Sequence, residues 1–340
     1  MKVALYAHTH GIGYRDDVDL HARSVEFSEM QPLRVARLAE AQGFHSMWFP
    51  DHVCMPIASD SAHTANASGT RAYSASHNML DAQITMASVA AVTTTLRLGT
   101  TCLIAPYRHP LSDARQLSSI DVLSGGRLMV GVAAGWMAEE YTALGLDIAE
   151  RNSRLEECIE IYKRSWLDPV VSFSGEHYSF AEVSMDPKPL QNPRPPIMMG
   201  ATTPAGARRA ARVADGLYPL FLDPSAKPDR YSKLQDEVRR ELDRNGRNGG
   251  DFSMLCAVSG RLVDSGEAAG LSDAICTGSA EQILQDLERF AANGYSLAVL
   301  GLDIPSGTLA ELEEQIQRFG EAVIPEAEKI TTEGEWQPVD

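Results

Sequence analysis

Three histidines and an aspartate stand at the ends of apolar segments, where side chains could do chemistry. His8 and His10 end the apolar run at the start of the chain, and Asp51 and His52 end the run SMWFP. Side chains two residues apart in a strand face the same way, so His8 and His10 could share a metal ion or a cofactor. His52 is the stronger candidate, because a histidine there could donate a proton or a hydrogen bond at neutral pH. The alternative, a histidine packed at the edge of a loop, stays open.

A metal centre would need more ligands than His8 and His10. Barrel hydrolases that bind two metal ions also use histidines after strands five and six and an aspartate after strand eight. Asp303 could supply the aspartate, but no histidine follows His177. Two neighbouring ligands would leave a divalent cation under-coordinated. We therefore expect no metal site and keep a metal-dependent barrel hydrolase as a distant alternative.

Two segments have features that favour an anion. The turn GATTP, residues 200–204, opens a helix, and the backbone N–H groups at a helix N-terminus attract a phosphate. Arg151 and Arg154 lie one turn apart at the start of another helix, where cations oppose the helix dipole. A phosphate or a nearby carboxylate would compensate them. The turn could equally be an ordinary connection, and the arginines could pair with a loop carboxylate.

Composition excludes several classes of protein. The net charge of −16 argues against partners such as nucleic acid or an anionic membrane, which need basic patches. No stretch approaches the roughly 18–20 apolar residues of a membrane span, and no signal region precedes the first apolar run. The five cysteines are scattered without a CxxC motif, which favours a reducing cytoplasm. No GxGxxG or P-loop lysine motif supports a Rossmann domain or a nucleotide hydrolase.

Apolar strands alternate with amphipathic helices along the chain, which predicts a parallel sheet covered by helices. Eight such units at this length favour an α/β fold of the (β/α)8 TIM-barrel type, with the active site at the carboxyl ends of the strands. The expected strands are 2–8, 46–52, 96–106, 127–136, 196–201, 216–221, 252–263 and 296–303. The expected helices are 32–43, 81–93, 112–124, 150–166, 205–214, 232–246, 279–294 and 308–327.

Two segments are longer than the connections that a (β/α)8 barrel needs, and they predict insertions after strands two and four. Residues 54–80 are rich in Ser, Ala and His and have no periodic pattern, so we expect a long loop. Residues 168–195 predict a small hairpin followed by a Pro-rich connection. We expect one domain over residues 1–330 and a polar tail over 331–340.

Several motifs, in order and at matching spacing, resemble the bacterial luciferase-like superfamily of flavin- and F-420-dependent oxidoreductases. They are AEAQGFHSMWFPDH (39–52), LRLGTTCLIAPYRHP (96–110), QLSSIDVLSGGRLMVGVAAGW (116–136), EEYTALGLDIAERNSRLEECIEIYKRSW (139–166) and DPKPLQNPRPPIMMGATT (186–203). The likeness is strong over roughly residues 30–220. It implies the same (β/α)8 barrel with insertions.

The resemblance also assigns roles to residues of this chain. The catalytic histidine of the family corresponds to His52, preceded by Asp51. Strand three of the family runs beside the flavin ring, often through a bulge or a non-proline cis peptide. Cofactor contacts are therefore expected at Thr101, Cys102 and Ile104 along the ring, at Ala134, Gly135 and Arg154 near the phosphate, and at Gly200, Ala201 and Thr202 through the backbone.

Three departures from the family patterns bear on the cofactor and the substrate. Sugar-phosphate dehydrogenases that use coenzyme F-420 have a tryptophan and a glutamate where this chain has Pro56 and Trp136. Luciferase has an arginine at the position of Ala134. The motifs PYRHP and GW nevertheless resemble a subgroup commonly assigned to F-420. The sequence therefore leaves open whether the cofactor is FMN or F-420.

The leading hypothesis is a two-component monooxygenase that uses reduced FMN from a separate flavin reductase and acts on a small organic substrate. An F-420-dependent hydride-transfer enzyme is the second hypothesis, and a cofactor-binding protein without catalysis is the third. His8, His109 and Trp136 are expected at the substrate end of the site from their places after strands. The family resemblance implies a homodimer formed through the helices near 81–93 and 112–124.

Overall fold

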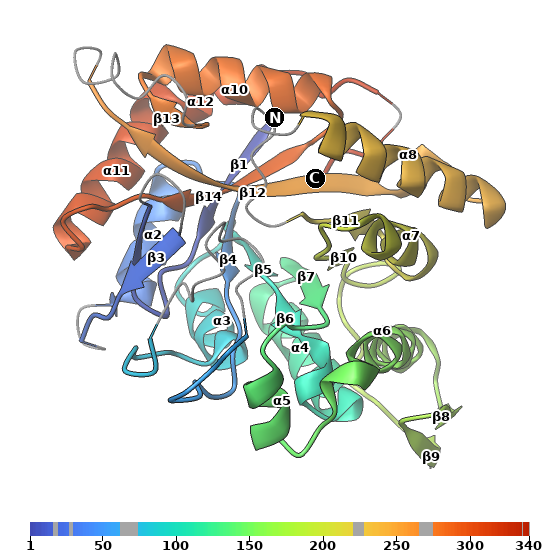
Figure 1. Ribbon diagram of the computed structural model, residues 1–340. Coiled ribbons are helices and arrows are strands. Elements are labelled where there is room, and N and C mark those ends of the chain that lie inside the picture. Colours follow the sequence, from blue (N-terminus) through green and yellow to red (C-terminus); the bar gives the residue numbers. More distant parts are fainter. Residues whose placement is uncertain are drawn as a thin grey trace.

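Parallel strands close into a barrel in the computed structural model, which describes residues 1–15, 20–26, 30–61, 74–219, 228–264, 275–334 and 336–339. Each strand pairs with the next, and β7 pairs with β10 to complete the closure (Figure 1). In barrel order the strands are β1 (Lys2–Tyr6), β4 (Ser46–Phe49), β5 (Arg97–Thr100) continued by β6 (Leu103–Ile104), β7 (Leu128–Ala133), β10 (Ile197–Met199), β11 (Gly216–Leu217), β12 (Ser253–Leu262) and β14 (Leu297–Leu302). The predicted (β/α)8 TIM barrel is confirmed.

Helices surround the barrel and bury their apolar faces against it (Figure 1). They are α2 (Pro32–Ala41), α3 (Ala82–Ala90), α4 (Pro110–Ser124), α6 (Arg151–Leu167), α7 (Pro204–Val213), α8 (Pro228–Arg244), α10 (Ala280–Ala292), α11 (Leu309–Ala322) and α12 (Ile324–Ala327), with the short α5 (Ala138–Ala143) after β7. Local sequence explains their starts. Asp81 accepts the Ile84 N–H at the start of α3, and Ser279 with Gln282 forms a capping box at the start of α10.

The barrel interior is filled by side chains rather than left as a channel. Trp48 of β4 and Tyr218, which follows β11, lie with their ring centroids 5.0 Å apart. Gly99 of β5 makes room for the indole, because a Cβ there would lie 2.4 Å from it. Val339, near the end of the chain, is buried in the same interior group of side chains.

Some predicted boundaries are wrong. The first two strands end at Tyr6 and Phe49, earlier than expected, because the chain leaves the sheet where the polar residues begin. The expected helix over 308–327 is two helices, since Pro325 has no backbone N–H to continue α11. A hairpin of β2 (Ile12–Arg15) and β3 (Leu20–Arg23) follows strand one and was not predicted.

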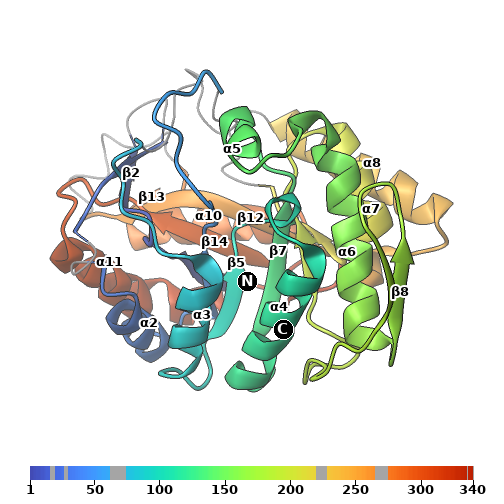
Figure 2. The same ribbon diagram turned by 90° about the horizontal axis from the view of Figure 1, so that it is seen from below.

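The insertion predicted at 168–195 contains the expected hairpin, formed by β8 (Val171–Ser174) and β9 (Ser179–Val183). The hairpin lies along the outer side of α6 (Figure 2). Its turn is held there because the Glu157 carboxylate of α6 accepts the backbone N–H groups of residues 176–178. Of the loop predicted over 54–80, residues 62–73 lie outside the described residues.

Candidate active site

The carboxyl ends of strands three, four and five lie side by side and present backbone and small side chains. The Thr101–Cys102 peptide bond is cis and separates β5 from β6, at the position where the family resemblance implied a bulge or a cis peptide. The Gly200 N–H donates to the Val132 carbonyl at 2.8 Å. A Cβ on Gly200 would lie 2.8 Å from the Cys102 Sγ, so the two strand ends can approach this closely only with glycine there.

Further small residues extend this surface. Ala134, Gly135, Ala201 and Thr202 are half-buried, and Gly135 has a φ of +75°, which favours glycine. A Cβ at Gly135 would also lie 2.8 Å from the Ile104 side chain. The structure therefore brings most of the predicted cofactor residues together. A surface of backbone and small side chains fits a flat ring system, and we call residues 101–104, 133–135 and 200–202 the strand-end surface.

His52 forms a buried pair with a glutamate that the sequence analysis missed. Its Nδ1 lies 2.7 Å from the Glu140 Oε2, and the two side chains are 5% and 0% exposed. The other oxygen of Glu140 accepts the backbone N–H groups of Val53 and Cys54 at 2.7 and 3.1 Å. Burial opposes ionisation of Glu140, but the hydrogen bonds from His52 and the backbone outweigh it and lower the pKa of this carboxyl. Trp136 packs edge-on against the His52 ring.

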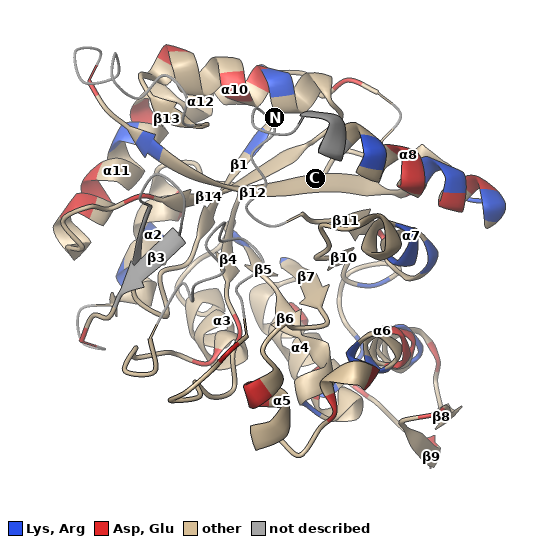
Figure 3. Cartoon of the chain, in the orientation of Figure 1, with Lys and Arg blue, Asp and Glu red and all other residues tan. Residues whose placement is uncertain are grey.

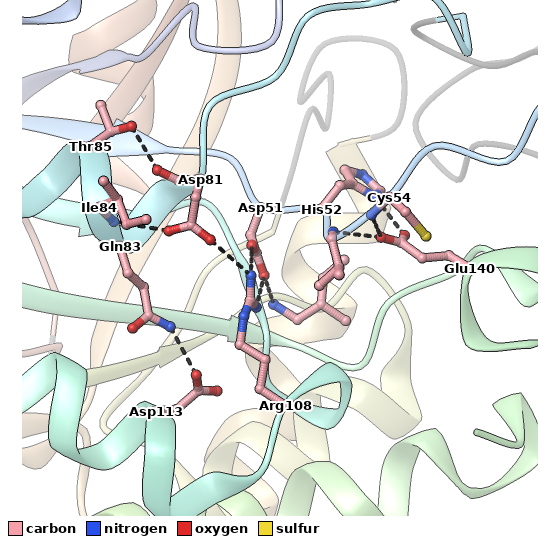
Figure 4. A network of polar contacts seen from close by, with 12 residues as sticks. Asp51, His52, Cys54, Asp81, Gln83, Ile84, Thr85, Arg108, Asp113 and Glu140 are labelled. Carbon is pink, nitrogen blue, oxygen red and sulfur yellow. Dashed lines mark hydrogen bonds and ion pairs between the residues drawn. The ribbon is translucent and has the colours of Figure 1, made fainter. Parts of the chain in front are cut away.

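Asp51, the neighbour of His52, belongs to a different polar group (Figure 4). Its carboxylate accepts two hydrogen bonds from the Arg108 guanidinium, both 2.8 Å long, and one from the Ile104 N–H at 2.9 Å. Burial opposes the charge on Arg108, but its bonds to Asp51 raise the pKa of the guanidinium. Because both Asp51 oxygens are engaged, the structure gives Asp51 a positioning role: it joins the end of β4 to β6. The catalytic role predicted for Asp51 stays a prediction.

His8 and His10 lie beyond the end of β1, and their rings have different hydrogen-bond partners. His8 Nε2 lies 3.2 Å from the Leu302 carbonyl oxygen, and His10 Nε2 lies 2.8 Å from the Tyr6 hydroxyl. Burial lowers the pKa of His8 to about 4 and that of His10 to about 3, so both rings are neutral at pH 7. Among the described residues no three His, Cys, Asp or Glu side chains form a metal-binding group.

Two predicted residues, His109 and Arg154, both contact Tyr178 of the hairpin. The exposed His109 begins α4, where its Nδ1 accepts the Leu111 N–H, and its ring contacts Tyr178 of the hairpin. Arg154, at the start of α6, pairs with Glu150 at 2.7 Å and lies over the Tyr178 ring. The sequence left open whether a phosphate or a nearby carboxylate compensates the charge of Arg154, and the structure shows the Glu150 carboxylate in this role. A contact of Arg154 with a phosphate stays a prediction.

A closed parallel barrel with polar side chains at the carboxyl ends of its strands is the arrangement of TIM-barrel enzymes. Residues 13–274 match the luciferase-like monooxygenase family. The chain belongs to this family of enzymes, and the resemblance seen in its motifs is confirmed.

Named relatives cover both cofactor branches. An uncharacterized protein of Mycobacterium bovis is 31% identical over 273 residues, which are 76% of this chain and 92% of that protein. The FMNH(2)-dependent dimethylsulfone monooxygenase of Pseudomonas putida is 37% identical over 188 residues, 54% of this chain and 47% of that protein. The F420-dependent glucose-6-phosphate dehydrogenase of Microbacterium testaceum is 30% identical over 243 residues, 70% of this chain and 66% of that protein.

Solved structures agree with the fold. A monooxygenase from Streptomyces bottropensis superposes with a TM-score of 0.72 at 22% identity, over 96% of this chain and 99% of that chain.

No helix in the described part of the chain is both long enough and apolar enough to cross a membrane.

Proposed function

We propose that the protein is a two-component monooxygenase that uses reduced FMN, supplied by a separate reductase, to oxidise a small organic substrate with O2. The strand-end surface beside the buried His52–Glu140 pair is the observation that carries this proposal. When bound, reduced FMN would supply the two electrons with which one oxygen atom of O2 enters the substrate and the other leaves as water. The relative from Pseudomonas putida, which is FMNH2-dependent, supports the choice of FMN.

Different residues of this chain serve the cofactor, the proton transfer and the substrate. The backbone at Thr101–Ile104 and Gly200–Thr202 would hold the ring system, and Arg154 with Gly135 would hold the phosphate. His52 gives or takes a proton beside the reacting atoms. His8 and Trp136 line the substrate end; His109 contacts Tyr178 of the hairpin.

We expect the segment after β4 to help keep water out of this site. The segment 52–61 is tied to α5 by the carboxylates of Glu139 and Glu140. Excluding water strengthens the polar interactions inside a site and suppresses side reactions. A closed segment here would therefore favour oxygen transfer over the release of peroxide.

A second candidate is hydride transfer with coenzyme F-420. The sugar-phosphate dehydrogenases that use F-420 have a glutamate where this chain has Trp136, and here Glu140, four residues further along the chain, brings a buried carboxylate to His52. The glucose-6-phosphate dehydrogenase relative, which covers more of this chain, is F420-dependent.

An anaerobic fluorescence titration with reduced FMN and, in parallel, with F-420 separates the two candidates. We expect reduced FMN to bind with a Kd in the micromolar range or below and F-420 to bind more weakly. Binding of F-420 alone would exclude the monooxygenase and direct the search to hydride acceptors. Binding of neither would remove both candidates.

We also propose that two copies of the chain pair through α3 and α4. Helix α3 has no charged residue, in a protein with a net charge of −16 (Figure 3). Ile84 of α3 is 70% exposed and Leu123 of α4 is 66% exposed.

The free thiols of all five cysteines fit the reducing cytoplasm that we propose as the compartment.

Ile84→Glu is expected to convert the dimer into a monomer, because the charge would be buried without a partner in the interface. Sedimentation velocity measures the change. Val170→Glu, on an exposed residue next to the hairpin, is the matched control and should leave the dimer intact. A wild-type monomer at micromolar concentration would contradict the proposed pairing.

A further inference from the structure

We propose that Glu140 is a positioning residue that holds the proton of neutral His52 on Nδ1 and so presents Nε2 as the nitrogen for proton transfer. The role of Nε2 in catalysis rests on the proposed function, whereas the position of the proton on Nδ1 is argued from the hydrogen bonds alone. Figure 4 shows the His52 ring next to the Glu140 carboxylate.

The two oxygens of Glu140 have different partners, and this difference carries the argument. Oε1 accepts the backbone N–H groups of Val53 and Cys54, and Oε2 lies 2.7 Å from Nδ1 of His52. Backbone N–H groups can only donate, so Oε1 must be an acceptor. The lowered pKa of Glu140 keeps the group ionised at neutral pH, so Oε2 is an acceptor as well. The hydrogen on this bond therefore belongs to His52 Nδ1.

The pair also fixes the direction of the His52 ring. Glu140 is fully buried and bonds to the backbone of the two residues that follow His52, so the carboxylate, the backbone and the ring form one rigid group. Trp136 packs against the ring. With Nδ1 held by Glu140, Nε2 lies on the opposite side of the imidazole, where it can act as a base when the ring is neutral and as an acid when it is protonated.

Glu140→Gln tests this assignment because the backbone dictates how the new amide must point. The N–H groups of Val53 and Cys54 require the amide oxygen at the position of Oε1. The amide NH2 must then face His52 Nδ1, which can accept its hydrogen bond only without a proton. Neutral His52 is therefore expected to carry its proton on Nε2 in this variant, the wrong nitrogen for a base. A tautomer error of this kind lowers turnover by about 10²–10⁴-fold in a comparable histidine–carboxylate pair.

Glu139→Gln is the matched control. Glu139 lies on the same turn of α5 and accepts hydrogen bonds from Ser59, Asp60 and Ser61, but none of these reaches His52. The control therefore disturbs the same segment and removes the same charge. It should leave the His52 tautomer unchanged.

The experiment is ¹⁵N NMR of histidine-labelled protein without cofactor, recorded across pH, with His52 assigned by the loss of its signals in His52→Asn. We expect an Nδ1–H tautomer for neutral His52 in the wild type and in Glu139→Gln, and an Nε2–H tautomer in Glu140→Gln. An Nε2–H tautomer in the wild type would overturn the inference even if the variant fails to fold. An unchanged tautomer in folded Glu140→Gln would overturn it too. Because no cofactor is present, these outcomes are independent of whether FMN binds.

Discussion

His52→Asn is expected to lower turnover by about 10²–10⁴-fold while the affinity for the reduced cofactor stays within a few-fold of the wild type. Asparagine can place an amide N–H near the position of Nδ1 and so keep a hydrogen bond to Glu140, but it has no group at the position of Nε2. The substitution therefore removes the proposed proton-transfer atom without leaving a buried carboxylate unpaired.

The rate of product formation measures this effect, with reduced FMN supplied by a separate reductase and the substrate found by a screen of small organic compounds. Thermal unfolding and the anaerobic titration are run on the same preparation, so that a loss of fold or of cofactor is recognised. Turnover within ten-fold of the wild type would show that His52 is not the group that moves the proton.

Arg108→Met is expected to destabilise the folded protein by about 3–5 kcal/mol, because it leaves the Asp51 carboxylate buried without its cation. Asp51 is fully buried, and Arg108 makes two of the three hydrogen bonds that its carboxylate accepts. The Asp81 carboxylate also lies 3.5 Å from the Arg108 guanidinium (Figure 4). The substitution therefore removes a cation that two carboxylates share.

Urea denaturation of two further variants shows whether the effect belongs to the buried pair. Asp51→Asn combined with Arg108→Met removes both charges, and an Asn oxygen can still accept the Ile104 N–H; this double variant should regain part of the lost stability. Arg164→Met removes an exposed pair with Glu160, a hydrogen bond to the Ser172 carbonyl and a contact with the Phe173 ring, and should cost about 1 kcal/mol or less. Equal costs for Arg108→Met and Arg164→Met would contradict the structural role of Arg108.

The barrel could be predicted from the sequence because its strands and helices have strong, separate patterns. Strand β14 is a continuous apolar run, as expected of a strand buried on both faces, and α7 alternates buried alanines with arginines that are half-buried or exposed. Strand ends could not be predicted as well. A cis bond at Thr101–Cys102 interrupts the third strand within a run of strand-forming residues, and periodicity has no signal for it.

The site was predictable where a motif stands at a strand end and was missed where the partner is distant in sequence. His52 follows an apolar strand, whereas Glu140 lies 88 residues further on, in the first turn of a short helix. Acidic residues are common there because they favour the helix dipole, so Glu139 and Glu140 looked ordinary. Arg108 was likewise part of a recognised motif. Its pairing with Asp51 could not be predicted, because it depends on how the segments after β4 and β6 approach each other in the fold.

The central claim is that a reduced flavin lies on the strand-end surface beside His52. A crystal structure of the protein grown without oxygen in the presence of reduced FMN tests it most directly. The claim predicts the ring system against residues 101–104 and 200–202, with Nε2 of His52 within hydrogen-bonding reach of the cofactor or of one bridging water. Reduced FMN bound on another surface, or bound here with His52 beyond the reach of one water, would contradict it.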